Sequence, residues 1–347
     1  MSLLKTLGKN PSGAVLEKVK QSPNYKNNAF KNSSPTVMMA GNDSFIKILW
    51  KFINKPPGTK PAGLIPSVKT DLKTLNAEKP VIVWFGHSSY FIRIGGTNIL
   101  VDPVFSGHAS PFSFTAKSFP GANVYGVDDI PPVDILIITH DHYDHLDYET
   151  VLKLRSKTTL VCTSLGVASH LVYWGFDKNN IIEFDWWDSK NISPGIKIST
   201  TTARHFSGRS FVRNKTLWSA FILDAYGYKI YIGGDSGYDN HFKRIGDTFG
   251  SFDLAILESG QYNTAWPQIH MMPEETVQAS VDLKAKVLLP VHWGKFSLSM
   301  HAWDEPVRRV MAKAGELGVR VTTPMIGEQV IIDECYPDSK WWEGVGK

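Results

Sequence analysis

The stretch THDHYDHLD, at residues 139–147, contains three histidines and a carboxylate within the six positions from 140 to 145. These four side chains are His140, His142, Asp144 and His145. Burying such a group without a partner is costly, because each polar side chain loses its hydration. A lone histidine is usually structural, but this density of ligand types favours a metal site. The H-x-H-x-D-H spacing suits two adjacent cations better than one.

Three further candidate ligands stand directly after other apolar runs. His205 ends KISTTTARH, Asp235 ends KIYIGGD and His292 ends KVLLPVH. Ligands at the carboxyl ends of strands are what α/β architectures commonly present. Nitrogen and oxygen ligands without a thiolate suit Zn²⁺, with Mn²⁺ or Fe as alternatives. The sequence therefore predicts a metal site of histidines and aspartates, large enough for two ions that share a carboxylate.

Short β-branched and aromatic runs from residue 80 onward predict the strands that must position these ligands. The runs are VIVWFG, YFIRI, NILVD, VDILIIT, TLVCT, IIEFD, KISTTT, SAFILDA, KIYIGG, LAILES and VLLPVH. Helices are expected at 147–156 and at 273–285, the second of which opens with Pro273 and Glu274. Hairpin-like strands come first, and strands alternating with helices follow. This order favours two packed sheets with helices outside over a single doubly wound sheet.

Residues 1–79 differ in composition and are expected to form a Lys-rich arm that packs on the main domain, residues 80–347. Residues 1–80 contain 13 lysines and no arginine against four carboxylates, a balance of about +9, whereas the whole chain carries +4. Short helices are expected at 13–20 and at 44–53. A solvated leader is the ordinary interpretation, but such an arm could also attract an anionic phospholipid surface. Nucleic acid is disfavoured, because the arm has no arginine and few aromatic side chains for stacking on bases.

Composition predicts a globular protein of a reducing compartment. The 347 residues, 42% hydrophobic and 20% charged, suffice for a sizeable core. The two cysteines, Cys162 and Cys335, cannot form a disulfide framework. The start of the chain lacks the apolar core of a signal peptide, and the longest apolar runs are too short to span a bilayer. We therefore expect a cytoplasmic protein, with peripheral membrane contact through the arm as an option.

The set THDHYDHLD, ARHFSGR, GGDSGY and PVHWG resembles the metallo-β-lactamase superfamily. Longer stretches such as WFGHSSYFIRIGGTNILVDPVFS and IHMMPEET make the chain most similar to the N-acyl-phosphatidylethanolamine-hydrolysing phospholipase D family, over roughly residues 80–300. The resemblance implies an α/β fold, the αββα sandwich, with a dinuclear zinc site. It further implies that one zinc is held by His140, His142 and His205, the other by Asp144, His145 and His292, and that Asp235 bridges them.

The expected activity is hydrolysis of N-acyl-phosphatidylethanolamine-type lipids or of another small phosphodiester. Two adjacent cations lower the pKa of a shared water, so that a hydroxide between them attacks phosphorus in line. Asp144 is expected to orient that water. One alternative on the same metals is lactone opening of the ascorbate-6-phosphate lactonase type, and another is a metal-binding protein without turnover. The resemblance also leaves a homodimer open.

Two residues near the expected metals are candidates for contacting the phosphate. His270 matches a residue of the resembled family and is a candidate acid for the leaving group. Ile269 and Met272 depart from the family pattern beside it, which leaves the head-group preference open. Arg209, in HFSGR, could pair with phosphate or with a structural carboxylate.

Several other residues are interpreted by their surroundings. Tyr262, Trp266 and Trp293 are expected to wall an acyl groove, although each type is more often found in a core. Asp102, in LVDPVFS, is expected to anchor its own turn, and the resemblance implies that it lies near the site. The GHSSY stretch at 86–90 lacks the G-x-S-x-G elbow of serine hydrolases and is interpreted as structural.

Overall fold

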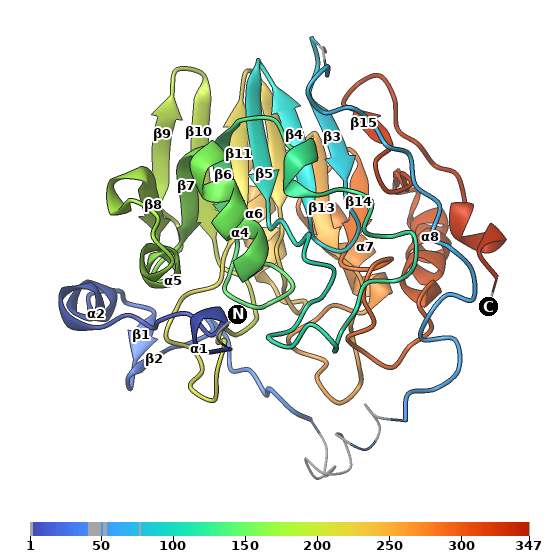
Figure 1. The fold of residues 1–347 in the computed structure, drawn as a ribbon. Coiled ribbons are helices and arrows are strands. Elements are labelled where there is room, and N and C mark those ends of the chain that lie inside the picture. The colour runs from blue at the N-terminus through green and yellow to red at the C-terminus, as the bar shows by residue number, and fades with distance from the viewer. Residues whose placement is uncertain (1–2, 41–49, 51–53, 76–77, 347) are drawn as a thin grey trace.

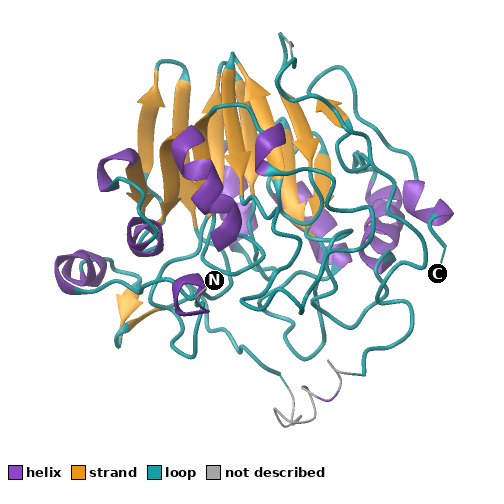
Figure 2. Ribbon diagram, viewed as in Figure 1, coloured by secondary structure: helices purple, strands orange, loops and turns teal. Residues whose placement is uncertain are grey.

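The computed structural model describes residues 3–40, 50, 54–75 and 78–346, and their elements form the four layers drawn in Figures 1 and 2. Two β-sheets face each other, and helices cover the outer side of each sheet. This αββα sandwich confirms the fold class predicted from the order of strands and helices in the sequence.

The first sheet has the strand order β15-β3-β4-β5-β6-β7-β8. Its strands are β3 (Val81–Trp84), β4 (Tyr90–Ile94), β5 (Thr97–Val101), β6 (Val133–Ile138), β7 (Thr158–Ser164), β8 (Ile181–Phe184) and β15 (Gln329–Ile331). Strands β3 to β5 pair antiparallel, whereas β5 to β8 pair parallel. The direction changes where long crossovers replace tight turns, because parallel neighbours need a crossover connection.

The second sheet has the order β14-β13-β12-β11-β10-β9. Its strands are β9 (Ser189–Ser193), β10 (Ile196–Thr201), β11 (Ala220–Ala225), β12 (Tyr228–Ile232), β13 (Leu254–Glu258) and β14 (Leu288–Val291). Every run predicted as a strand forms one. The sequence analysis missed β9 and β15. The first is a polar, largely exposed edge strand without apolar alternation, and the second has only three residues.

Helices pack on both outer faces of the sandwich. The first sheet is covered by α4 (Tyr148–Leu154) and α5 (Ala168–Tyr173), and the second by α6 (His241–Phe249), α7 (Pro273–Asp282) and α8 (Glu305–Leu317). Helices α4 and α7 confirm the two predicted in the main domain. Single turns of 3-10 helix lie at η1 (Val127–Asp129), η2 (Arg155–Lys157), η3 (Lys178–Asn180) and η4 (Trp341–Gly344). Apolar side chains from both sheets form the central core between them.

The N-terminal arm lies against the ends of both sheets. It contains α1 (Leu3–Thr6), α2 (Gly13–Lys20) and the hairpin β1 (Tyr25–Lys26) and β2 (Ala29–Phe30). Helix α2 confirms the helix predicted at 13–20, while the one predicted at 44–53 lies outside the described residues apart from Trp50. Phe30 is fully buried in a cluster with Leu217 and Trp218. The described part of the arm is therefore packed on the main domain.

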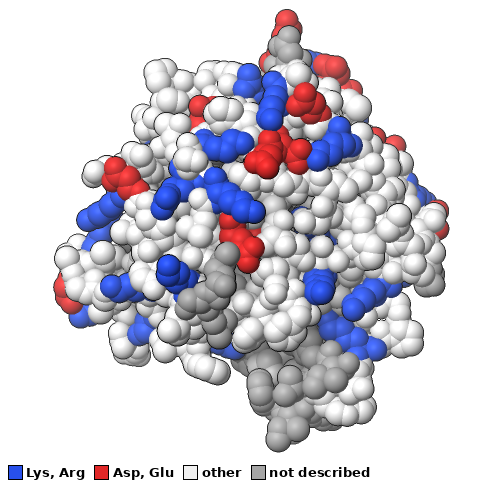
Figure 3. Space-filling model, in the orientation of Figure 1, with Lys and Arg blue, Asp and Glu red and all other residues white. Residues whose placement is uncertain are grey.

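The visible charges are mixed on the face drawn in Figure 3, where Lys and Arg side chains lie interspersed with Asp and Glu side chains. In the part of the chain that the structure describes, no helix combines the length and the apolar character needed to cross a bilayer.

Candidate metal centre

Loops at one end of the strands bring the seven predicted ligands together. His140, His142, Asp144 and His145 lie between β6 and α4, His205 follows β10, Asp235 follows β12 and His292 follows β14. The strands are short and buried, so each loop starts from a fixed position. Side chains from four separate segments thus meet in one place.

One half of the cluster consists of three imidazoles and one oxygen of Asp235. Nδ1 of His142 lies 3.0 Å from Nε2 of His140 and 3.2 Å from Nε2 of His205. Asp235 Oδ2 lies 3.8 Å from Nε2 of His140 and 3.6 Å from Nε2 of His205. Ring nitrogens that approach each other this closely are well placed to share a cation.

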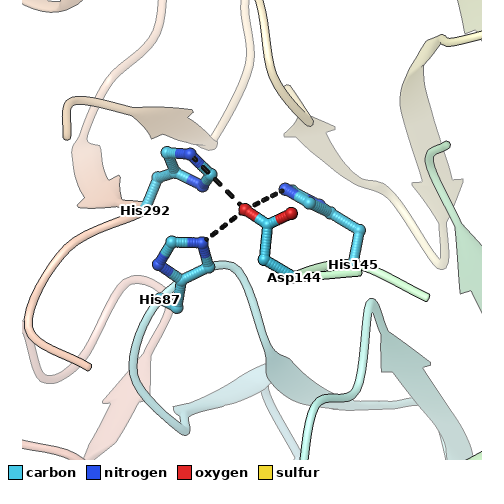
Figure 4. A group of neighbouring side chains, drawn as sticks. All are labelled: His87, Asp144, His145 and His292. Atoms are coloured by element: carbon cyan, nitrogen blue, oxygen red, sulfur yellow. Dashed lines mark hydrogen bonds and ion pairs between the residues drawn. The ribbon is translucent and has the colours of Figure 1, made fainter. Parts of the chain in front are cut away.

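The other half contains His87, Asp144, His145 and His292 (Figure 4). Asp144 Oδ2 lies 2.9 Å from Nε2 of His87, 3.7 Å from Nε2 of His145 and 3.9 Å from Nε2 of His292. Asp235 Oδ1 lies 3.1 Å from Nε2 of His145 and 3.2 Å from Nδ1 of His292. Asp235 therefore presents one carboxylate oxygen to each half of the cluster.

His87 was missed as a member of the site, because the sequence analysis interpreted GHSSY as structural and did not connect it with the predicted ligands. Its ring is fully buried and donates from Nε2 to Asp144, while its carbonyl accepts a 2.7 Å hydrogen bond from Nε1 of Trp84. Its φ of 54° lies in the left-handed region, a strained conformation for a residue other than glycine. The signal was present, because His87 follows a strand as the predicted histidine ligands do.

Five side chains of the cluster have the protonation states that a cation requires of its ligands. Burial holds the pKa of His140, His205 and His292 well below the usual value, so these imidazoles are neutral. Burial alone would raise the pKa of Asp144 and Asp235, but neighbouring imidazoles hold both well below the usual range. The two carboxylates are therefore ionised.

His145 is surrounded by three carboxylates. Burial would lower its pKa, but Asp235, Asp144 and Asp102 raise it well above the usual value. The buried atoms Nε2 of His145 and Oδ1 of Asp235 have no hydrogen-bond partner of suitable geometry. Nitrogen and oxygen donors left in this state fit divalent cations.

A surrounding layer of hydrogen bonds orients the imidazoles. Oδ2 of Asp102 accepts a 2.7 Å bond from Nδ1 of His145 and a 2.6 Å bond from the hydroxyl of Thr139. Asp102 therefore lies at the site and holds the end of β6, rather than only its own turn. The hydroxyl of Ser88 shares a 2.8 Å hydrogen bond with Nδ1 of His292. Partners of this kind fix ring orientation and tune metal affinity.

The N-terminal arm holds one of the predicted ligands directly. The side chain of Asn32 donates to the carbonyl of His205 at 2.8 Å, and the backbone N–H of His205 donates to the side-chain oxygen of Asn32 at 3.0 Å. Nε1 of Trp218 donates to the same oxygen at 3.1 Å. Nothing in the sequence singles out Asn32, because the contact joins segments 173 residues apart.

His270 lies beside the cluster with a partner that the sequence analysis missed. Its Nδ1 lies 3.0 Å from Oε2 of Glu258, and its ring stacks on His292 with centroids 5.3 Å apart. Burial would lower the pKa of His270, but the Glu258 carboxylate raises it, so the imidazole keeps its proton at neutral pH. Glu258 is the last residue of β13 and fully buried, a position where a carboxylate without a role is rare.

A pocket of about 620 Å³ opens onto the cluster, and both carboxylates, Asp144 and Asp235, lie in its wall. Its remaining wall is mainly apolar, built by Met38, Met39, Phe206, Trp266, Ile269 and Leu298. Trp266, one of the three aromatic residues expected to wall a groove, lies in this wall. Two of these residues, Met38 and Met39, come from the N-terminal arm.

Arg209 does not have the role expected of it. Its side chain is only 3% exposed, and its guanidinium donates to the carbonyls of Thr6, Asp141 and Leu146. These three backbone acceptors occupy the guanidinium, although Arg209 also lines a groove beside His142 and Asp144, so its hydrogen bonds favour a structural role over the predicted phosphate partner. Arg209 instead ties the arm to the loop that carries the metal ligands.

Tyr262 and Trp293 also lie elsewhere than predicted. The Tyr262 hydroxyl donates to Oε1 of Glu305 at 2.6 Å, and its ring stacks on His301. Trp293 is 1% exposed, donates from Nε1 to the carbonyl of Pro290 at 2.9 Å and packs in the central core. Neither side chain lines the pocket, so the prediction that they wall the groove is wrong.

Comparison with known proteins agrees with this geometry. The family model of the Beta-lactamase superfamily domain matches residues 97–293. An uncharacterised protein of Mycobacterium tuberculosis is 38% identical over 327 residues, which cover 93% of this chain and 88% of that protein. The mitochondrial N-acyl-phosphatidylethanolamine-hydrolysing phospholipase D of Saccharomyces cerevisiae is 33% identical over 265 residues, 73% of this chain and 55% of that protein. The metallo hydrolase Igni18 of Ignicoccus hospitalis superposes with a TM-score of 0.57 at 20% identity, covering 73% of this chain and 97% of that one.

Proposed function

We propose, from the premise that the chain belongs to the metallo-β-lactamase superfamily, that this metal-dependent hydrolase cleaves phosphodiesters, in particular lipids of the N-acyl-phosphatidylethanolamine type. The observation that carries the proposal is the position of Asp235 at the apolar pocket. Its two oxygens face different imidazole groups, Oδ2 toward His140 and His205 and Oδ1 toward His145 and His292. A carboxylate in this position suits two cations at the separation that phosphoryl hydrolysis uses.

In this proposal the chain holds two zinc ions in the two halves of the cluster. His140, His142 and His205 would hold one, and Asp144, His145 and His292 the other, with Asp235 shared. When bound, such ions lower the pKa of a water molecule and neutralise charge on phosphoryl oxygens. His87 and Asp102 hold Asp144 and His145 in place through hydrogen bonds of 2.9 and 2.7 Å.

The reaction itself is a hydrolytic displacement at phosphorus. A bond forms between phosphorus and the oxygen of the attacking water, which Asp144 orients and which releases a proton to solvent, and the bond from phosphorus to the alcohol oxygen breaks. His270 gives the departing oxygen its proton. Because Nδ1 of His270 is paired with Glu258, Nε2 is the nitrogen left to donate. One water is consumed, and an N-acyl-phosphatidylethanolamine yields phosphatidic acid and an N-acylethanolamine.

The lining of the pocket supports a lipid over a small polar substrate. Met38, Met39, Trp266, Ile269 and Leu298 offer dispersion contacts and few hydrogen bonds, whereas a sugar-phosphate lactone would need polar groups around its hydroxyls. This composition favours the phosphodiesterase over the lactonase alternative.

The proposal is tested by incubating the zinc-loaded protein with N-palmitoyl-phosphatidylethanolamine, with bis-p-nitrophenyl phosphate and with a sugar-phosphate lactone. Mass spectrometry should find phosphatidic acid and N-palmitoylethanolamine, and visible absorption should detect p-nitrophenolate. Asp235→Asn should lose at least about 100-fold in rate on both phosphodiesters, since a ligand shared by both cations is weakened.

Asp338→Asn, at an exposed position near the C-terminus, is the matched control and should keep full activity. Lactone opening without cleavage of either phosphodiester would overturn the proposal. Full activity of Asp235→Asn would overturn the role given to the carboxylate.

A further inference from the structure

A second groove of about 590 Å³ also reaches the metal cluster, where His142 and Asp144 lie in its wall. Its wall is built by Leu7, Ala109, Pro111, Phe112, Phe206 and Phe211, and we call it the phenylalanine groove. The pocket described above, with Met38, Met39, Trp266 and Leu298 in its wall, we call the methionine groove. The two grooves draw these apolar walls from different segments of the chain.

The two grooves meet at a junction. His142, Asp144, Phe206 and Arg213 line both of them, so the junction lies at the metal cluster itself. The Phe206 ring packs against His142 with centroids 4.4 Å apart, and the guanidinium carbon of Arg213 lies 5.1 Å from the centre of the Phe206 ring. The junction therefore combines metal ligands with an arginine on an aromatic support.

Arg213 differs from the buried Arg209 in the groups that its guanidinium contacts. Arg213 is exposed and lies over the face of Phe206, whereas three carbonyls occupy Arg209. A guanidinium stacked on a ring keeps its N–H groups available for an anion and suits the planar pairing that phosphate accepts. Arg213 thus supplies the positive charge that an anionic group at the junction would require.

The rim of the phenylalanine groove exposes large apolar side chains to solvent. Phe211 is 107% exposed and Phe112 is 44% exposed. Large apolar side chains that surround a groove usually mark the binding site of an apolar ligand or partner. The groove runs to the metal cluster, so an apolar chain in it would be connected to the group that reacts.

We propose that each groove takes one of the two apolar chains that flank the phosphate of such a lipid diester, with Arg213 binding the phosphate at the junction. The inference rests on the proposed function, and it adds that both sides of the scissile group are recognised. A diester with a chain on one side only would leave one groove filled with water. Each methylene transferred from water to an apolar wall contributes about 0.8 kcal/mol, about fourfold in affinity.

The test uses binding of simple phosphodiesters and does not depend on turnover. Dioctyl phosphate carries a chain on each side, and methyl octyl phosphate carries one. Calorimetry on the zinc-loaded protein, below the micelle concentration of each probe, should give a Kd at least about 10-fold lower for dioctyl phosphate than for methyl octyl phosphate. Burial of two or three methylenes in the second groove is enough for this difference.

Variants that fill one groove identify where each chain lies. Ala109→Trp fills the phenylalanine groove and Leu298→Trp fills the methionine groove, both at partly exposed positions. Each single variant should raise the Kd of dioctyl phosphate to that of methyl octyl phosphate, whose one chain can use the open groove. The double variant should weaken both probes. Leu317→Trp, on the exposed side of α8, is the control.

Arg213→Met should weaken both probes by a similar factor, roughly 5-fold, and Arg213→Lys should restore most of the loss. Equal affinity of the two probes, or an undiminished advantage of dioctyl phosphate in the double variant, would overturn the two-groove inference. Failure of the proposed function would give a different result. The protein would then not cleave bis-p-nitrophenyl phosphate, which has no apolar chains, but it would still bind dioctyl phosphate more tightly than methyl octyl phosphate.

Discussion

Nε2 of His87 lies 2.9 Å from Oδ2 of Asp144, although 57 residues separate them in the sequence. His87 comes from the turn after β3, and Asp144 comes from the loop after β6. The hydrogen bond fixes the carboxylate that faces His145 and His292. The strained backbone conformation of His87 places its ring against the Asp144 carboxylate.

His87→Ala is expected to weaken zinc binding by about 10–100-fold, the usual effect of removing a residue that orients a metal ligand. The measurement is competition with a chromogenic chelator. His108→Ala, whose ring contacts a loop carbonyl instead of the cluster, is the control and should bind zinc normally. Unchanged affinity in His87→Ala would mean that the Asp144 carboxylate is held well enough by other contacts.

Asn32→Ala tests whether the N-terminal arm supports the metal centre. Removal of the side-chain amide takes away both hydrogen bonds that fix the backbone of His205. Zinc affinity should fall by about 10-fold, and the chelator titration should show the loss in one class of site. Asn179→Ala, in the exposed turn of η3, serves as the control. If the Asn32 variant binds zinc like the control, the arm only covers the site.

His270→Gln should slow the hydrolysis of diesters with an alcohol leaving group more than that of diesters with a p-nitrophenolate leaving group. Loss of a general acid costs about 10²–10⁴ in rate when the leaving group is an alcohol, because an alkoxide needs a proton. The p-nitrophenolate ion leaves without one, so bis-p-nitrophenyl phosphate should slow by less than about 10-fold. Steady-state kinetics on both substrates measure the difference. An equal loss on both would assign His270 to binding rather than to proton transfer.

Lys295 is expected to make stability depend on pH. Its side chain is 1% exposed and donates to the carbonyls of Phe85 and Val104, and burial lowers its pKa to about 7 from 10.5. Between these values the unfolded chain binds a proton that the folded protein does not. The free energy of unfolding should therefore rise with pH from about 7 to about 10, by at most about 1.4 kcal/mol per unit.

Urea unfolding of the wild type and of Lys295→Met at pH 7.5 and 9.5 checks this expectation. The gain in stability with pH should be smaller in the variant, whereas Lys197→Met, at an exposed position, should follow the wild type. Parallel pH curves for wild type and Lys295→Met would show that the folded protein keeps this lysine charged.

Arg209→Met is expected to act on stability rather than on phosphate binding. The substitution leaves the carbonyls of Thr6, Asp141 and Leu146 without their charged donor, which should lower the free energy of unfolding by about 2–4 kcal/mol. Arg209→Lys should recover only part, since one ammonium cannot reach all three acceptors. A raised KM for bis-p-nitrophenyl phosphate with unchanged stability would restore the phosphate-binding role.

Local sequence was sufficient to predict most strands of the two sheets, the layered fold and the candidate ligands that follow strands. Apolar runs separated by turn signals give the strands directly, and His140, Asp235 and His292 each stand where a strand ends. Ligand chemistry is a property of residue type, so it can be read without coordinates.

The tertiary structure decided which other side chains reach the site and which do not. His87, Glu258 and Asn32 join it through contacts between distant segments, whose partners depend on the order of strands in the sheets and on the path of the arm. An arginine or a tryptophan has the same chemistry at a pocket and in a core, so only burial and hydrogen-bond partners assigned Arg209 and Trp293 to structural roles. Residue type determines the chemistry that a side chain can perform, whereas tertiary packing determines which groups the side chain contacts.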